Sequence, residues 1–269
     1  SAISPALCHP SNPDEAEVLV ENNTAKVSIV GAGMIGRPGV AAKMFSTLAA
    51  AGVNIQMIST SEVKVSCLVD ATDCDRAIAA LCHAFEITAS PAALSTPTPQ
   101  NPAVRGVALD MNQARIAIRL VPDQPGMSAK LFGMLAEFNI SVDMIIQSQR
   151  CRVVDGVARR DIAFTVARMD AENAKEKLTQ VAAELGWGEV VLDQAIAKVS
   201  IVGSGMVGQP GIAAKMFQSL AENHINIQMI ATSEIKISCV VAQEEGVKAL
   251  QVIHAAFGLS GSEKFVVPA

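Results

Sequence analysis

The sequence predicts an α+β protein built from tandem β-α-β-β-α-β modules, because it contains an internal repeat and each copy has the pattern of such a module. Residues 25–69 and 197–241 align without a gap and are identical at most positions. A third, diverged copy at residues 114–166 keeps the Pro-Gly pair and the Ala-Lys-x-Phe run. A repeat of this length indicates a duplicated structural unit. We therefore expect the function to be something that one small module does more than once.

The elements of the first copy follow from its apolar pattern. Residues 26–30 alternate and are rich in β-branched side chains, which predicts a strand. Pro38 suits a first helical turn, where its missing donor would be unpaired anyway. Apolar residues at helical spacing, Val40 to Leu48, then predict a helix that Gly52 ends. The other expected elements are strands at 53–58 and 63–69, a helix at 75–85 and a final strand after it.

This element order defines a ferredoxin-like module, an antiparallel four-stranded sheet with helices on one face. Such modules are small, so we expect copies to pair side by side and bury more surface. The expected domains come from the repeat and from the Pro-, Ser- and Thr-rich segment near residue 95. They are the tail of a truncated upstream module at 1–22, a module at 23–95, a linker at 96–103, and modules at 104–195 and 196–269.

Composition excludes several classes of function. Half of the residues are apolar and 17% are charged, which excludes global disorder. A net charge of −5, a single Trp and no Tyr argue against a nucleic-acid partner.

No stretch approaches the ~18 apolar residues of a membrane span, and no signal peptide is evident. The cysteines lack Cys-x-x-Cys spacing and the histidines lack metal-site spacing. We expect a cytoplasmic protein with reduced thiols, no metal and no membrane partner.

A glycine-rich loop resembles a dinucleotide-binding fingerprint. Gly31, Gly33 and Gly36 match G-x-G-x-x-G, and residues 203–208 repeat the pattern. However, the next strand carries no acidic residue for the ribose. Pro38 and Gly39 also delay the helix, and the module is too short for a doubly wound sheet. We expect no nucleotide cofactor in this chain.

Several longer motifs resemble the regulatory region of aspartokinase. They are KVSIVGAGM, NIQMISTSE, and ARIAI with VPDQPG and NISVDMIIQS in the middle copy. The resemblance covers residues 16–269 and implies ACT domains, amino-acid sensors that pair side by side, in a multi-ACT arrangement similar to that of cyanobacterial enzymes. It also implies that residues 104–110 form a strand that crosses into the neighbouring ACT domain, here the last one.

The same resemblance implies that this chain lacks the catalytic domain of aspartate kinase. It also implies that the chain has that catalytic domain as a partner. Nothing here resembles the lysine-glycine-glycine-threonine-serine phosphate site of that enzyme. We therefore expect no catalytic residues and no phosphorylation by the chain alone. ATP and Mg would belong to the missing domain, and the effectors would be lysine or threonine.

An amino-acid effector needs groups for its carboxylate and its ammonium. The predicted helix starts at Gly39 and Gly211 suit a carboxylate. Asn54 and Gln56 could accept from an ammonium, and Glu62 or Glu234 could pair with a lysine side chain. Alternatively, these glutamates are exposed turn residues, and the methionines fill the core. The resemblance implies contacts at Met34, Arg37, Gly39, Val40, Ala41, Asn54, Ile55, Gln56, Ser61 and Glu62, and at Met206, Gln209, Gly211, Ile212, Ala213, Asn226, Ile227, Gln228, Ser233 and Glu234.

The middle copy offers a different set of groups. Asp123 and Gln147 combine an acid with an amide, which suits the ammonium and hydroxyl of threonine. We expect this site at the interface with the last module, and we expect Asp123→Ala to spare the fold because the position reads as a loop. Asp123 could instead only form an Asx-type turn. The implied contacts are Asp123, Gln124, Pro125, Gly126, Met127, Ser128, Ser141, Val142, Asp143 and Gln147.

Two functional hypotheses follow. In the first, lysine or threonine shifts the paired modules and so regulates a distant kinase domain by feedback inhibition. In the second, the modules only assemble the protein and bind nothing. In both, the free sheet edges favour a homo-oligomer, a dimer or larger.

Overall fold

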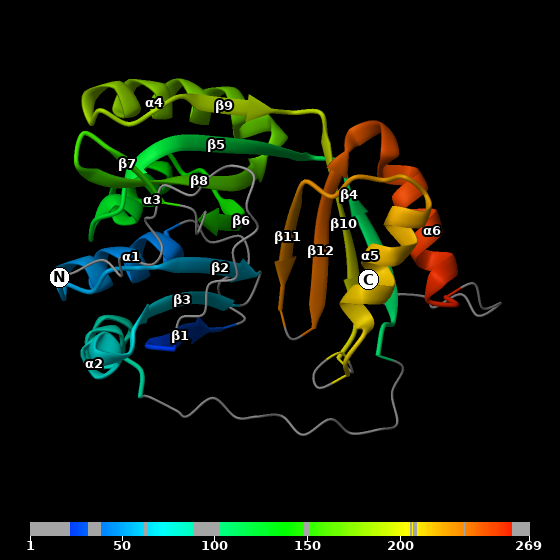
Figure 1. The fold of residues 1–269 in the computed structure, drawn as a ribbon, viewed down its shortest axis with the longest axis horizontal. Coiled ribbons are helices and arrows are strands. Elements are labelled where there is room, and N and C mark those ends of the chain that lie inside the picture. The colour runs from blue at the N-terminus through cyan, green and yellow to red at the C-terminus, as the bar shows by residue number, and fades with distance from the viewer. Residues whose placement is uncertain are drawn as a thin grey trace. The chain divides into compact units, whose positions relative to one another are not determined.

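The computed structural model describes residues 22–31, 39–61, 64–88, 103–147, 151–204, 206, 209–233 and 235–259. The chain divides into two compact units (Figure 1). The first unit contains the first and middle modules, and the second contains the last module with the segment 92–113. The proposed upstream tail at 1–22 and the linker at 96–103 lie almost wholly outside the described residues.

The first module has the predicted order, although its second strand begins later. Its elements are β1 (Thr24–Val30), α1 (Val40–Ala50), β2 (Met57–Ser61), β3 (Lys64–Asp70) and α2 (Cys74–Phe85). Because β2 begins at Met57, Asn54 and Gln56 lie in the loop before it. Gly39 precedes α1 at φ 95°, a left-handed conformation that favours glycine. Residues 86–88 form no strand, and residues 89–102, where the final strand was expected, lie outside the described part.

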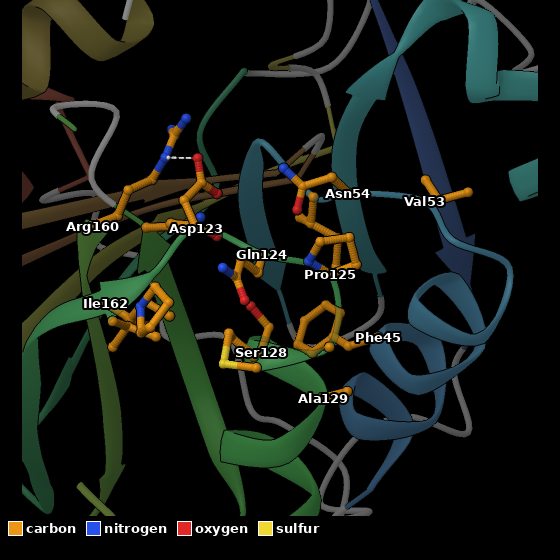
Figure 2. A pocket seen from close by; sticks show the side chains of 16 residues that line it. Phe45, Val53, Asn54, Asp123, Gln124, Pro125, Ser128, Ala129, Arg160 and Ile162 are labelled. Carbon is orange, nitrogen blue, oxygen red and sulfur yellow. Dashed lines mark hydrogen bonds and ion pairs between the residues drawn. The ribbon is translucent and has the colours of Figure 1, made fainter. Parts of the chain in front are cut away.

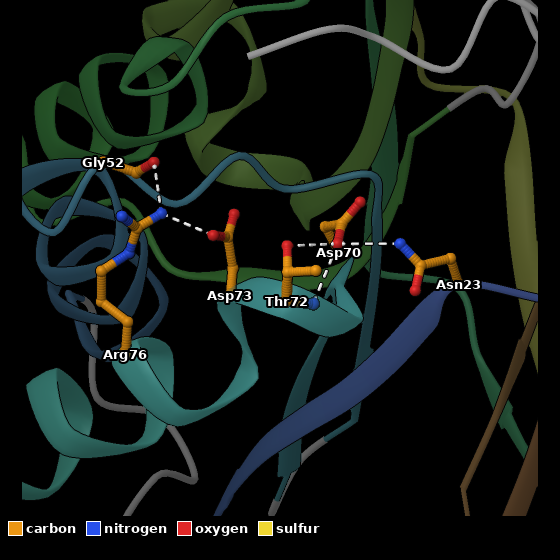
Figure 3. A network of polar contacts seen from close by, with 6 residues as sticks. All are labelled: Asn23, Gly52, Asp70, Thr72, Asp73 and Arg76. Atoms are coloured by element: carbon orange, nitrogen blue, oxygen red, sulfur yellow. Dashed lines mark hydrogen bonds and ion pairs between the residues drawn. The ribbon is translucent and has the colours of Figure 1, made fainter.

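A polar network joins the ends of three elements of the first module (Figure 3). The carboxylate of Asp70 accepts hydrogen bonds from the backbone N–H and the hydroxyl of Thr72 and from Asn23. These bonds lower the pKa of Asp70. Arg76, in the first turn of α2, pairs with Asp73 and donates to the carbonyl of Gly52. The network fixes the start of α2 against the end of α1.

The middle module shows the complete β-α-β-β-α-β order with an added hairpin. Its elements are β5 (Gln113–Pro122), α3 (Met127–Glu137), β6 (Val142–Gln147), β7 (Arg152–Val154), β8 (Val157–Ala167), α4 (Ala171–Glu184) and β9 (Val190–Asp193). β7 and β8 are joined at Asp155 and Gly156, which both have positive φ, as the Asp-Gly pair predicts for a two-residue hairpin turn.

The first and middle modules share one sheet of order β1-β3-β2-β6-β8-β5-β9, with β7 on β8. β2 pairs with β6 antiparallel, with Ser59 opposite Ile146. The hydroxyl of Thr60 donates to the carbonyl of Asp143 at 2.8 Å and accepts from the N–H of Ile145 at 2.9 Å. On the helical side, the rings of Phe45 and Phe132 lie 5.4 Å apart in a continuous apolar core.

This pairing corrects one expectation. The middle module was expected to meet the last module, but within its unit it pairs with the first. The expectation confused two different edges of the module. A crossing strand adds beside the first strand of its host, whereas side-by-side pairing uses the opposite edge, formed by β2 or β6.

The second unit contains a four-stranded sheet of order β11-β12-β10-β4. β4 pairs with β10 antiparallel from Lys198 opposite Asp110 to Val202 opposite Gly106, so a strand from before the middle module closes the last sheet. The α+β prediction is confirmed. The elements are β4 (Gly106–Asp110), β10 (Ile196–Val202), α5 (Ile212–Glu222), β11 (Met229–Thr232), β12 (Lys236–Ala242) and α6 (Gly246–Ala256).

The first glycine of the last fingerprint has a structural role in this unit. A Cβ at Gly203 would overlap the carbonyl of Ala103, where the chain enters β4. The requirement for glycine at this first position of the motif therefore comes from close packing of two backbone segments.

Burial raises the pKa of Cys67 and Cys239 to about 12, so these thiols stay protonated and pack as small apolar groups. Among the described helices, none is long and apolar enough to cross a membrane.

We predict that Asp110 stabilises the second unit in a pH-dependent way. Burial alone would raise its pKa, but hydrogen bonds from Asn112 and Gln113 and the charge of Lys198 lower it overall. The stabilisation is therefore present above the unfolded pKa of about 3.9 and is lost as pH falls through the lower folded value.

Asp110→Asn should lower the melting temperature at neutral pH and flatten its decline below about pH 4. Thermal melts followed by circular dichroism measure this, with Glu176→Gln on the exposed face of α4 as the control. An unchanged acid dependence in Asp110→Asn would show that the carboxylate contributes nothing.

Candidate functional site

A pocket lies between the first and middle modules, at the start of α3 (Figure 2). Its volume is about 380 Å³, which includes open solvent at its mouth. The first module contributes the loop before β2, and the middle module contributes the loop from β5 to α3 and parts of β6 and β8. The lining residues are Phe45, Val53, Asn54, Ile55, Val121, Pro122, Asp123, Gln124, Pro125, Gly126, Met127, Ser128, Ala129, Gln147, Arg160 and Ile162.

The start of α3 supplies the donors of this pocket. Gly126 precedes the helix at φ 93°, a conformation that favours glycine. The first N–H groups of a helix have no partner within it, and the helix dipole favours negative charge there. The N–H of Met127 donates to the carbonyl of Gln124 at 3.3 Å, which leaves Ser128 and Ala129 as the next residues of the first turn that line the pocket. This end of the pocket therefore suits a carboxylate.

Gln147 supplies an acceptor without a donor. Its side chain lies at the end of β6, is 7% exposed and lines the pocket. Its Oε1 accepts no hydrogen bond from any described residue. A buried acceptor left unpaired costs about 1–3 kcal/mol, which a ligand N–H or O–H could recover. The pocket thus presents donors at one side and an acceptor at another.

Asp123 does not present an open carboxylate. The Nε of Arg160 donates to its Oδ2 at 2.8 Å, and both side chains are at most 3% exposed (Figure 2). Arg160 also donates through Nη1 to the carbonyl of Gln56 in the first module, at 3.2 Å. Asp123 was expected to meet the ammonium of a ligand, but its charge is already compensated within the protein.

The residues on either side of Arg160 hold the end of β5, which leads into that loop. Arg159 donates through Nη1 to the carbonyls of Leu120 and Gly186, at 3.0 and 2.7 Å. The N–H of Leu120 donates to Asp161 at 3.0 Å. Leu120 has φ 55°, a conformation that is uncommon for a non-glycine residue. Three consecutive residues of β8 therefore hold the end of β5 and the first residue of the loop into α3.

Sequence reasoning missed Arg160, although a signal was present. In the repeat, the position of Arg160 corresponds to Val63 and Ile235, which are apolar. A charged residue at a position that is apolar in both other copies indicates a buried ion pair or a site specific to the middle module. Only the structure shows that its partner is Asp123.

The pocket unites predicted residues from two modules. Sequence reasoning grouped Asn54, Ile55 and Gln56 with the helix start at Gly39 of the same module. The structure places Asn54 and Ile55 in the lining of the pocket at the start of α3. A Cβ on Gly126 would lie 3.8 Å from Cβ of Ala49, and one on Gly39 would lie 3.6 Å from Cβ of Ala136. The end of each helix thus lies beside the start of the other.

Other predicted residues lie apart from this pocket. Gly39, Val40 and Ala41 begin α1 and are half-buried, Ser141 is exposed, and Val142 and Asp143 are half-buried in β6. In the last module, Met206 is buried in the core, which agrees with its role as core filler. The other described positions there are exposed or half-buried, namely Gln209, Gly211, Ile212, Ala213, Asn226, Ile227, Gln228 and Ser233.

Several predicted positions cannot be placed. Met34, Arg37, Glu62 and Glu234 lie outside the described residues, and Ser61 is described only as the last residue of β2. Their assignment as effector contacts stays a prediction.

We predict that Asp123→Ala destabilises the first unit by about 3–5 kcal/mol, because it leaves the buried Arg160 without a counter-charge. This replaces the expectation that the fold would be spared. Asp123→Asn/Arg160→Met, which removes both charges, should cost much less. Denaturant titration measures the change through fluorescence of Trp187, the sole tryptophan, which is buried in this unit. Equal stability of Asp123→Ala and wild type would contradict the assignment.

Comparison with known proteins identifies the modules. A family model described as ACT domain matches residues 27–85 and 199–257, and another with the same description matches residues 115–183. The solved aspartate kinase from Synechocystis is 60% identical with a TM-score of 0.87, over 97% of this chain and 44% of that one. The regulatory subunit of aspartate kinase from Thermus thermophilus is 50% identical with a TM-score of 0.52, over 58% of this chain and 99% of that one.

The aspartokinase of Thermus thermophilus is 49% identical over 159 residues, which are 58% of this chain and 38% of that relative. The chain thus spans less than half the length of the curated relatives it matches. The ACT models match most of its length, and the chain aligns with nearly all of a regulatory subunit. The chain belongs to the ACT-domain family and carries the regulatory ACT domains of an aspartokinase.

Proposed function

We propose that this chain binds an end-product amino acid, lysine or threonine, and thereby regulates the aspartate kinase catalytic domain by feedback inhibition. The observation that carries the proposal is the buried Oε1 of Gln147, which accepts no hydrogen bond from the described part of the chain and lies in a pocket that also contains the start of α3. An acceptor and a group of helix donors facing one space suit the two charged groups of a free amino acid.

The ligand would be held at both ends. Its carboxylate would accept from the N–H groups at the start of α3, and its ammonium or hydroxyl would donate to Gln147. Asn54, which reaches the pocket from the first module, offers a further amide (Figure 2). These contacts require no metal and no cofactor in this chain. ATP and Mg would serve the catalytic domain of the whole protein.

Regulation would follow from the position of the pocket. Its walls come from two modules that are joined through β2 and β6. A ligand that binds one arrangement of these modules better than another shifts the equilibrium between the arrangements. Effector binding and kinase activity would then be linked through a coupling free energy.

Similar proteins support this role. A structure described as aspartokinase alpha and beta subunits is 44% identical with a TM-score of 0.53, and this chain covers all of the matched chain. The Thermus thermophilus match is described as a regulatory subunit. By extension, we propose that the ACT domains here associate with a catalytic domain in the cytoplasm and form a homo-oligomer.

A purely structural role is the alternative. It is favoured by the extent of the contact between the first two modules, which share a sheet and one apolar core. Calorimetric titration of the chain with each amino acid separates the two hypotheses, because an assembly module would show no saturable heat.

We predict that Gln147→Leu weakens threonine binding by about ten- to a hundredfold, the value of one charge-assisted hydrogen bond of about 1.5–3 kcal/mol. Stability should stay equal or rise, because an unpaired acceptor is removed from the interior. Calorimetry gives the affinity and denaturant titration the stability, with Gln180→Leu on exposed α4 as the control. Unchanged affinity in Gln147→Leu would exclude this amide as a ligand contact.

A further inference from the structure

We infer that Arg160 makes this pocket selective for an amino acid with an uncharged side chain, because it occupies the carboxylate that a cationic side chain would need. This inference rests on the proposed function, that the pocket binds a free amino acid. Arg160 would decide between two chemical classes of effector, amino acids with a neutral side chain and amino acids with a second ammonium.

The charges of the pocket carry the inference. Among the described residues that line it, Asp123 is the one acidic residue and Arg160 the one basic residue. The two form an ion pair at 2.8 Å, so the lining has no net formal charge. A zwitterion with a neutral side chain brings no net charge either. A lysine side chain would add one positive charge, and among the described lining residues no carboxylate is left to meet it.

Burial prevents a ligand from separating Arg160 and Asp123. Both side chains are at most 3% exposed, and a buried charge that loses its partner is strongly unfavourable. A ligand ammonium therefore cannot take Asp123 from Arg160 without leaving the guanidinium uncompensated. Arg160 is held from a second side, since it also donates to the carbonyl of Gln56.

The other polar groups fit a neutral amino acid. The start of α3 suits the carboxylate, and Gln147 has one buried acceptor open to an N–H or O–H. Both are neutral, so neither offers the counter-charge that a second ammonium requires. In the first and last copies the position of Arg160 is Val63 or Ile235. An arginine at this position is therefore specific to the middle module.

The test compares threonine and lysine at this pocket alone. The methyl group of Met127, which lines the pocket, can be followed by NMR in the full chain labelled at methionine methyl groups. Met127→Leu assigns the signal by its disappearance. Titration of this signal gives the dissociation constant of each amino acid here, whatever else binds to the other modules. In the wild type, threonine should bind at least about tenfold tighter than lysine.

Two independent variants should reduce this preference. Arg160→Met frees the carboxylate of Asp123, and the ratio of lysine to threonine dissociation constants should fall by about tenfold or more. Gln124→Glu adds an acid at an exposed position of the lining and leaves the buried pair intact, so it gives the same direction of change even if Arg160→Met does not fold. Arg152→Met and Gln180→Glu make the same charge changes at exposed positions away from the pocket and should leave the ratio unchanged.

The outcomes separate this inference from the function on which it rests. Equal affinities of the wild type for threonine and lysine, or an unchanged ratio in Gln124→Glu and in folded Arg160→Met, overturn the role of Arg160 and leave amino-acid binding in place. A Met127 signal that responds to neither amino acid overturns the proposed function, and the inference with it.

Discussion

The antiparallel pairing of β2 with β6 is the contact on which the rest of the first unit depends. It joins the strands of two modules into one sheet and brings α1 against α3, so that Phe45 and Phe132 meet in a single core. The register of β6 shifts between Val142 and Ile145, and there the hydroxyl of Thr60 pairs with the carbonyl of Asp143 and the N–H of Ile145. Because edge strands otherwise leave backbone groups unpaired, this contact both stabilises the modules and fixes their relative position.

The proposed effector pocket is a consequence of that contact. The ends of α1 and α3 lie beside each other's starts, so the loop that follows α1 reaches the start of α3. The loop carries Asn54 into a site that belongs mainly to the other module. Arg160 donates both to Asp123, in the loop from β5 to α3, and to the carbonyl of Gln56. It therefore connects that loop to the first module across the same boundary. The lining of the pocket therefore comes from both sides of the interface, which is where the proposed effector would contact both modules.

Local features could be predicted from the sequence because their causes are local. The helix starts at Gly39, Gly126 and Gly211 follow from the Pro-Gly pairs, and all three have the positive φ that glycine permits. Sheet-edge pairing could not be predicted, because β2 and β11 have almost the same sequence and either could suit β6. The partner of Asp123 was also hidden, since Arg160 is 37 residues away and lies in what reads as a charged loop.

The central claim is that one effector is held by two modules at once. Amide hydrogen exchange of the full chain, with and without saturating threonine, tests it most directly. Our account predicts that threonine slows exchange both at residues 127–130, the start of α3, and at residues 54–56, the loop before β2. Slower exchange in only one of these segments, or in neither, would contradict a site shared between the first and middle modules.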